Sequence, residues 1–283
     1  MIILNSRQCE SYRGVEHPES PERITRIVAL LEDRNIEITN HEIIASEKEL
    51  LLVHSQEHLE RLKNSVQENL DCPAYPNIFQ YASLSAGLAL QAGRLSSAGK
   101  DTFSLMRPPG HHASKDKSMG FCYLNNAALT ALHLRNYRGK VGILDIDNHH
   151  GNGTEEIVSG LEDVIFVDLH RHPDYPGTGM ISEKNCFNFP LKTKIGEEGY
   201  LLALNEALKK IKDFNPSILV VSAGFDGYCG DHIGNLGLFR SSYKKIGQKI
   251  KTLDVPVCSL LEGGYDLNNL PECVLNYIKG LED

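Results

Sequence analysis

The sequence VGILDIDNHHGNG, residues 141–153, joins a short apolar run directly to two carboxylates and two imidazoles. The run 141–144 is typical of a buried strand. Alternate residues of an extended segment share one face, so Asp145, Asp147 and His149 are expected to point the same way. Aspartate and histidine together suit zinc or a similar divalent ion. We therefore expect a metal site where a buried strand ends, and the alternative is a charged surface turn.

Comparable apolar, β-branched runs alternate with helical patterns along the whole chain. Strands are expected at residues 1–4, 102–106, 140–146, 164–168, 186–190, 217–222 and 256–261. Helices are expected at 79–97, 124–135, 197–214, 243–253 and 270–281, with two more beginning at a Ser20 cap and at a Ser46–Glu49 capping box. This alternation predicts an α/β fold with a mainly parallel sheet and helices on both faces. No linker or repeat interrupts it, so residues 1–283 are expected to form a single domain.

Composition narrows the class of protein. The 283 residues carry 29 Lys and Arg against 37 Asp and Glu, a formal charge of −8, which argues against broad nucleic-acid binding. The seven cysteines are irregularly spaced and form no Cys-x-x-Cys pair, so neither a disulfide framework nor a thiolate zinc site is expected. No apolar run is long enough to span a bilayer, and no secretory signal pattern opens the chain. A cytoplasmic enzyme is the expectation.

Four polar clusters each follow an expected strand. They contain His111 and His112, the segment 145–149, Asp226, and Tyr265. Ligands of open parallel sheets bind beyond the carboxyl ends of the strands, so the clusters are expected to converge at one rim. A set of unrelated surface loops is the alternative. A catalytic zinc needs about three protein ligands, and Asp226 is the best third after Asp147 and His149, unless it caps a helix or forms a salt bridge.

The remaining polar residues suggest general acid–base chemistry. His111 and His112 are adjacent in a proline-stiffened loop, and Asp145 and Asn152 are left over once the metal ligands are assigned. We expect Asp145 to orient His111 and keep it charged, and Asn152 to orient His112, which shuttles the proton. Tyr265, after two glycines, is expected to donate to an oxyanion. Read singly, tandem histidines are usually exposed loop residues and such a tyrosine is usually structural.

Five motifs then match a known family. They are RPPGHHA (107–113), GFCYLNN (120–126), DIDNHHGNGT (145–154), SAGFD (222–226) and EGGY (262–265). In order and spacing they resemble the zinc-dependent histone deacetylase family, which also includes acetylpolyamine amidohydrolases and acetoin-utilisation proteins. The resemblance implies an arginase-like α/β fold, one zinc per chain, and hydrolysis of an acyl-lysine-type amide.

The resemblance also implies roles for individual residues. Asp71 resembles the rim aspartate that holds the substrate backbone, and Gly120, Phe121 and Tyr175 resemble the wall of a narrow acyl-lysine tunnel. Arg23 resembles an arginine of the internal product channel. Ile233 aligns with a position where polyamine-selective relatives can carry a glutamate, which argues mildly against that form of selection. A structural potassium ion is implied, with oxygens near five residues: Asp145, Asp147, His149, Asp168 and Leu169.

Several hypotheses about function stay open. The leading one is a deacylase acting on an acetylated lysine of a peptide or protein, with acetylated polyamines or other small acylated amines as the alternative substrates. Asn152, where some members carry aspartate, resembles the class II-type and bacterial branch, and the presence of Tyr265 suggests a competent hydrolase. The rivals are an arginase-like hydrolase with two metals and a catalytically silent module that binds acetylated ligands. Neither nucleic acid nor membrane is expected as a partner, and the oligomeric state stays open.

Overall fold

The computed structural model describes residues 1–67 and 69–283. Its centre is an eight-stranded sheet in the order β2-β1-β3-β8-β7-β4-β5-β6, in which every neighbouring pair is parallel. The strands are β1 (Ile2–Asn5), β2 (Ile38–Asn40), β3 (Thr102–Ser104), β4 (Val141–Asp145), β5 (Val164–Arg171), β6 (Cys186–Leu191), β7 (Ile218–Ala223) and β8 (Val257–Leu261). This confirms the expected α/β fold with a parallel sheet.

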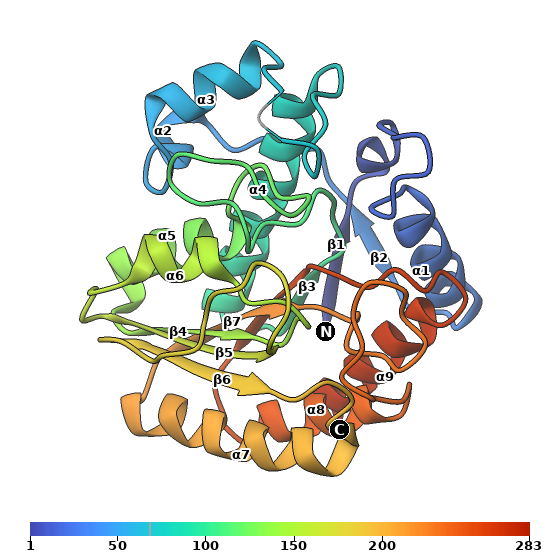
Figure 1. Ribbon diagram of the computed structural model, residues 1–283, viewed down its shortest axis with the longest axis vertical. Helices are drawn as coiled ribbons and strands as arrows, with labels where there is room; N and C mark the ends of the chain where they lie inside the picture. The colour runs from blue at the N-terminus through green and yellow to red at the C-terminus, as the bar shows by residue number, and fades with distance from the viewer. Residues whose placement is uncertain (68) are drawn as a thin grey trace.

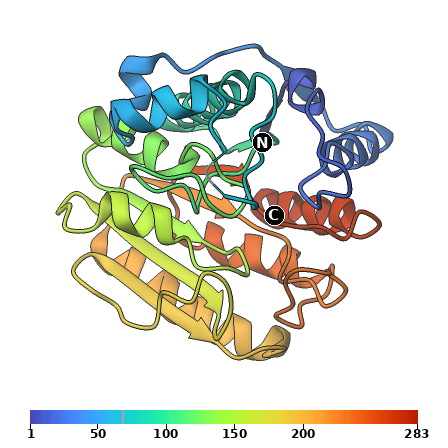
Figure 2. The same ribbon diagram turned by 45° about the horizontal axis from the view of Figure 1, so that its top comes forward.

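Helices cover both faces of the sheet. Figures 1 and 2 show α4, α5 and α6 on one face and α7, α8 and α9 on the other, with α1 against α9. The helical segments are η1 (Arg7–Glu10), α1 (Glu22–Asp33), α2 (Glu47–Leu50), α3 (Gln56–Lys63), α4 (Ile78–Ser97), α5 (Asn126–Arg138), α6 (Asn152–Val158), α7 (Gly196–Phe214), α8 (Ser242–Lys251) and α9 (Leu270–Glu282).

The central strands are buried on both sides. Every residue of β4, β7 and β8 is buried, as expected for strands of a parallel sheet that is covered by helices on each face. The strands β3, β8, β7 and β4 are direct neighbours, although they come from distant parts of the sequence. Their carboxyl ends therefore lie side by side, and the loops that follow them carry the four polar clusters.

Of the expected helix caps and strand ends, one is confirmed and two differ in the structure. The Ser46–Glu49 capping box is confirmed: the Ser46 hydroxyl accepts from the Glu49 amide at 3.4 Å, and the Glu49 carboxylate accepts from the Ser46 amide at 2.8 Å. The expected Ser20 cap of α1 is wrong, because Pro21 occupies the N-cap position and forms no side-chain cap. Strand β4 ends at Asp145, so the face shared by Asp145, Asp147 and His149 does not come from an extended segment.

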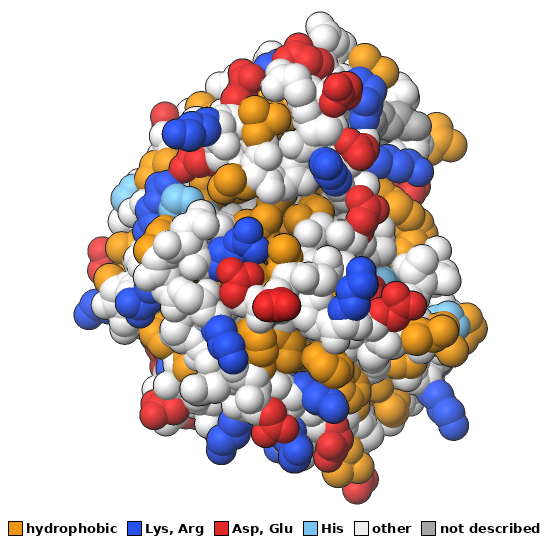
Figure 3. Space-filling view, turned by 90° about the vertical axis from the view of Figure 1, so that its left-hand side faces the viewer, with side chains coloured by type: hydrophobic (Ala, Val, Ile, Leu, Met, Phe, Trp, Pro, Cys, Tyr) orange, Lys and Arg blue, Asp and Glu red, His pale blue; other side chains and the backbone are white. Residues whose placement is uncertain are grey.

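The surface and hydropathy of the described chain add two observations. On the face in Figure 3, basic and acidic side chains are interspersed rather than gathered by sign. Among residues 1–67 and 69–283, no helix is both long enough and apolar enough to cross a membrane.

Candidate active site

Asp147, His149 and Asp226 come together beyond the ends of β4 and β7. The Nδ1 atom of His149 lies 3.1 Å from Asp147 Oδ1 and 2.9 Å from Asp226 Oδ2, and all three side chains are buried. Asp226 Oδ2 nevertheless has no hydrogen-bond partner among the described residues. A buried carboxylate oxygen without a partner is costly unless something else satisfies it. One imidazole nitrogen and two carboxylate oxygens directed at a common point fit a divalent cation.

The charges of this triad also suit a cation. Burial raises the pKa of Asp226 to about 6, and the neighbouring Asp147 carboxylate adds to the rise. Burial would lower the pKa of His149, but Asp226 and Asp147 outweigh it and bring that pKa to about 10. Two buried carboxylates thus compete for one positive group, and a divalent ion would neutralise both.

Two glycines let the backbone approach these ligands closely. A Cβ on Gly224 would lie 2.2 Å from Asp147 Oδ2, and a Cβ on Gly263 would lie 2.5 Å from the same atom. The amide of Gly263 donates to that oxygen at 2.8 Å. The amide of Asn148 likewise donates to Asp226 Oδ1 at 2.9 Å, so backbone donors fix the orientation of both carboxylates.

The histidine pair lies beside the triad with the partners that the sequence suggests. His111 Nδ1 is 3.0 Å from Asp145 Oδ2, and His112 Nδ1 is 2.7 Å from Asn152 Oδ1. The two imidazole rings lie tilted by 40° to one another, with centroids 4.0 Å apart. Both are buried, so the reading of His111 and His112 as exposed loop residues is wrong.

The two imidazoles have opposite electrostatic environments. Burial opposes charge on His111, but the carboxylates of Asp145 and Asp147 outweigh it and raise its pKa well above the ordinary value. For His112, burial lowers the pKa well below the ordinary value, and the positive charges of His111 and His149 lower it further. One imidazole therefore stays charged, and its neighbour stays neutral and able to accept a proton.

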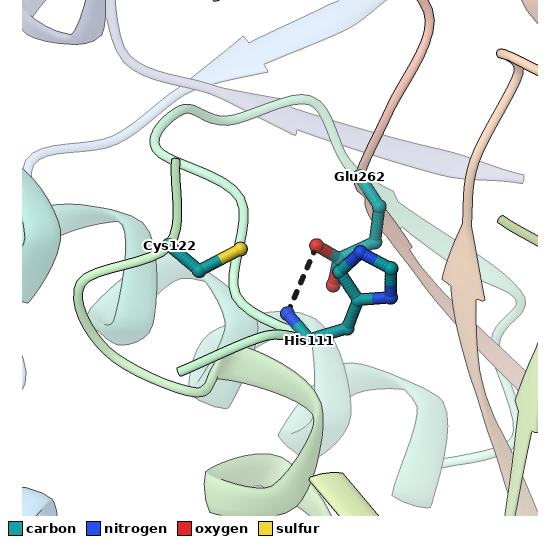
Figure 4. A group of neighbouring side chains, drawn as sticks. All are labelled: His111, Cys122 and Glu262. Carbon is teal, nitrogen blue, oxygen red and sulfur yellow. Dashed lines mark hydrogen bonds between the residues drawn. The ribbon is translucent and has the colours of Figure 1, made fainter. Parts of the chain in front are cut away.

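Glu262 holds the histidine loop, a role that the sequence reasoning missed. Its Oε2 accepts from the amides of Gly110 at 2.7 Å and His111 at 3.2 Å, and Figure 4 shows it beside Cys122 and His111. Glu262 is fully buried and lies 152 residues from Gly110. Its place in the EGGY motif was the available signal, but its partner could be identified only in the folded chain.

Tyr265 follows β8 and lines the same pocket as His112. Burial raises the pKa of its phenol well above the ordinary value, so the hydroxyl keeps its proton and can donate. Arg23 lies with its guanidinium 5.0 Å from the centroid of the Tyr265 ring and donates to the Gly264 carbonyl at 2.7 Å. Arg23 is fully buried and pairs with Glu19 at 3.2 Å, so it is not a surface charge of α1.

A narrow pocket of about 200 Å³ leads to these groups. Tyr175 meets the edge of His112 with ring centroids 5.2 Å apart, and Phe121 meets Tyr265 in the same way at 5.8 Å. The Tyr175 hydroxyl donates to Asp71 Oδ2 at 3.2 Å. Every residue expected to line a substrate tunnel is found here, together with Asp174, which was not anticipated; the lining is Asp71, His112, Gly120, Phe121, His149, Asp174, Tyr175, Ile233 and Tyr265.

Comparison with known proteins agrees with this geometry. Residues 17–281 match the model of the histone deacetylase domain family. The chain belongs to this family. It is 33% identical to a probable deacetylase of Methanothermobacter thermautotrophicus, over 100% of this chain and 91% of the relative. It is 34% identical to histone deacetylase 15 of Arabidopsis thaliana over 94% of this chain, and it spans about half of that protein, 52%.

Solved structures of the family have the same architecture. The HD domain of HDA15 superposes with a TM-score of 0.93 at 30% identity, covering 100% of this chain and 91% of that one. The acetylpolyamine aminohydrolase of Burkholderia pseudomallei gives 0.91 at 25% identity, covering 99% and 98%. The histone deacetylase family member described here is thus an amidohydrolase, a deacetylase, and family membership implies a zinc-dependent site.

In this deacetylase, two of the five residues expected near potassium, Asp147 and His149, belong to the buried triad, and the other three lie on β4 and β5. Asp145 on β4 is paired in register with Asp168 on β5, and Leu169 follows in the same strand. Asp168 accepts from the Gly151 amide at 2.7 Å. Burial raises the pKa of Asp145 to about 8, and although the charge of His111 opposes the rise, Asp168 adds to it.

Proposed function

We propose that this chain is a zinc-dependent deacylase that hydrolyses the amide of an acetylated lysine in a peptide or protein. The observation that carries the proposal is that His112, Tyr265 and His149 line one pocket, and that His149 belongs to the buried Asp147–His149–Asp226 triad. Burial lowers the pKa of His112 and raises that of Tyr265, which favours a neutral imidazole and a protonated phenol. A single catalytic zinc would be held by Asp147, His149 and Asp226. When bound, zinc lowers the pKa of its water and polarises the substrate carbonyl.

The protein's own residues supply the remaining steps. His112 accepts the proton of the attacking water at Nε2, because its Nδ1 is engaged by Asn152 at 2.7 Å, and returns that proton to the leaving amine. His111, paired with Asp145, stays positively charged beside His112 and so helps to keep the imidazole of His112 neutral. The Tyr265 hydroxyl donates to the oxyanion that forms from the carbonyl. Phe121 and Tyr175 exclude water from the alkyl chain of the substrate, and Asp71 accepts from its backbone at the rim.

Two further elements complete this proposal. A structural potassium ion near Asp145, Asp147, His149, Asp168 and Leu169 would offset the two carboxylates that face one another behind the zinc. Arg23, buried beneath Tyr265, would line the route by which acetate leaves. We further propose that residues 1–283 act as one catalytic domain, since the single sheet joins strands from both ends of the sequence. The cytoplasmic location stays a prediction.

A small acetylated amine is the second candidate substrate. Asp71 and Asp174 both line the pocket, and carboxylates there suit a cationic chain. Similarity to the acetylpolyamine aminohydrolase also supports this reading. Ile233, which also lines the pocket, argues mildly against one form of polyamine selection, because polyamine-selective relatives can carry a glutamate at the aligned position.

The two candidates are separated by comparing kcat/KM for acetyl-lysine peptides and for acetylated polyamines, using zinc-loaded protein with Asp226→Ala as the control. We expect turnover of the peptides that disappears in the variant. Turnover of the polyamines alone would keep the chemistry and overturn the proposed substrate. If Asp226→Ala turns over the peptides as fast as the wild type, Asp226 is not a ligand of the catalytic metal.

A further inference from the structure

The carboxylate of Asp231 joins two of the loops that form the pocket. Asp231 lies between β7 and α8, in the loop that carries the pocket-lining residue Ile233, and it is 9% exposed. Its Oδ1 accepts from the amides of Ile233 at 2.9 Å and Gly234 at 3.1 Å. Its Oδ2 accepts from the amides of Tyr265 at 2.6 Å and Asp266 at 3.1 Å, in the loop between β8 and α9. One side chain therefore holds four amides, two from each loop.

The backbone that leads into Tyr265 is free to turn. Gly263 and Gly264 precede it, and Gly264 has a φ of +122°, a conformation that favours glycine. A Cβ on Gly264 would lie 2.6 Å from Leu270 Cδ1, so the chain passes close to α9 here. A residue that follows two glycines needs an outside anchor to keep one direction, because glycine restricts the backbone least. Asp231 supplies two such anchors, and hydrogen bonds to a carboxylate are about twice as strong as neutral ones.

The other two amides belong to a loop that packs on a proposed zinc ligand. Ile233 lines the pocket, and Gly234 follows it in the chain. A Cβ on Gly234 would lie 2.3 Å from the backbone oxygen of Asp226, so this loop is seated directly on the segment that carries Asp226. Asp231 thus ties the position of Tyr265 to the backbone that carries a metal ligand and a wall of the pocket.

We propose that Asp231 is a positioning residue, which aims the Tyr265 hydroxyl by fixing the backbone of Tyr265 relative to Asp226 and Ile233. The inference rests on the proposed function, in which that hydroxyl donates to the oxyanion. Such a donor is effective only if it is directed in advance at the place where charge develops. A displacement of about 1 Å can cost on the order of 100-fold in rate, so an anchor on the donor's own amide acts on kcat. A residue that served stability alone would act equally with or without the hydroxyl.

A double-mutant cycle on kcat separates positioning from general stability, using zinc-loaded protein and its acetylated substrate at saturation. Asp231→Asn keeps the size of the side chain but removes its charge and one of its two acceptor oxygens. We expect it to lower kcat by roughly 10- to 100-fold, with the zinc content of the same preparation unchanged. In the Tyr265→Phe background, which has no hydroxyl to aim, the same change should lower kcat by no more than about twofold. A loss of equal size in both backgrounds, or loss of zinc from Asp231→Asn, would overturn the proposal.

The same cycle separates this inference from the proposed function. If Tyr265→Phe alone is as fast as the wild type, the donor role fails and the positioning role fails with it. If Tyr265→Phe is slow and the two losses multiply, only the positioning role fails. Asn235→Ala is the matched control, because Asn235 holds the same loop by donating to the Cys229 carbonyl at 2.9 Å. Its effect on kcat should be the same in both backgrounds, and a control that depended on the hydroxyl would contradict a specific role for Asp231.

Hydrogen exchange followed by NMR tests the anchor in the unaltered protein. Because one carboxylate holds all four, the amides of Ile233, Gly234, Tyr265 and Asp266 should be protected to a similar degree in the wild type. In Asp231→Asn, the amides of Tyr265 and Asp266 should exchange faster, while those of β7 and β8 stay protected. Fast exchange at Tyr265 in the wild type would contradict the proposal, even if Asp231→Asn does not fold.

Discussion

Burial sets the charge state of His112, and the hydrogen bond to the neutral Asn152 amide does not reverse it. A neutral amide at 2.7 Å leaves the pKa of His112 lowered, first by burial and then by the positive charges of His111 and His149. His112 must be neutral to accept a proton, so activity is lost as pH falls through its pKa. We therefore expect the acid limb of kcat/KM, at saturating zinc, to lie below pH 6.5, the approximate ordinary value for histidine.

Asn152→Asp tests this directly. A carboxylate next to an imidazole favours its charged form and typically moves the pKa by about 1–3 units. The acid limb of kcat/KM should therefore move to higher pH by about one unit or more. Asn152→Leu, which has similar size and no acceptor, is the matched control and should not move it upward. If the pH profiles of Asn152→Asp and the wild type coincide, His112 does not set the acid limb.

Tyr265 is expected to act in the transition state. Its phenol stays protonated because burial raises its pKa, and both Phe121 and Arg23 contact the ring. Removing the hydroxyl in Tyr265→Phe should cut kcat by roughly tenfold to a thousandfold, the scale of losing one oxyanion donor. Zinc content, measured on the same preparation, should not change. Wild-type turnover by this variant would exclude the donor role.

The element that matters most is the short loop after β8. Its first residue, Glu262, accepts from two amides of the histidine loop, and its last, Tyr265, enters the pocket. Glu262→Ala would leave the amides of Gly110 and His111 buried and unpaired. Unsatisfied buried donors cost about 1–3 kcal/mol each, so the free energy of unfolding should fall by at least about 2 kcal/mol.

Urea denaturation followed by circular dichroism measures this loss. Glu206→Ala, an exposed position on α7, is the control and should stay within about 0.5 kcal/mol of the wild type. A Glu262→Ala variant as stable as the control would mean that the histidine loop is held by other contacts. The hydrogen bonds from Glu262 in the loop after β8 would then add nothing measurable to the stability of the histidine loop after β3.

At the scale of the whole molecule, the sequence predicts the sheet well because its central strands are continuous apolar runs. The edge strand β2 escaped prediction because it is three residues long and only partly buried. Among the site residues, Asp147, His149 and Asp226 could be assigned because each directly follows a recognisable strand. The Glu19–Arg107 pair, fully buried and 88 residues apart, could not, since each residue alone reads as a surface charge.

The buried cluster of His150, Asp168 and His170 illustrates the same limit. His150 and His170 lie 20 residues apart on different elements, and Asp168 was expected only as a potassium ligand. Register between β4 and β5 places Asp168 opposite Asp145, while the turn after β4 turns His150 back toward β5. Such side chains are brought together by tertiary packing, which local periodicity does not encode.

Zinc-dependent acetate release from an acetyl-lysine peptide tests the central claim most directly. Protein stripped of metal is titrated with zinc in potassium buffer, alongside Asp226→Asn, which keeps the size of the side chain but loses its charge. The account predicts no turnover in stripped protein, full recovery on adding zinc, and no recovery in Asp226→Asn at any zinc concentration. Full turnover by stripped protein, or by zinc-treated Asp226→Asn, would contradict it.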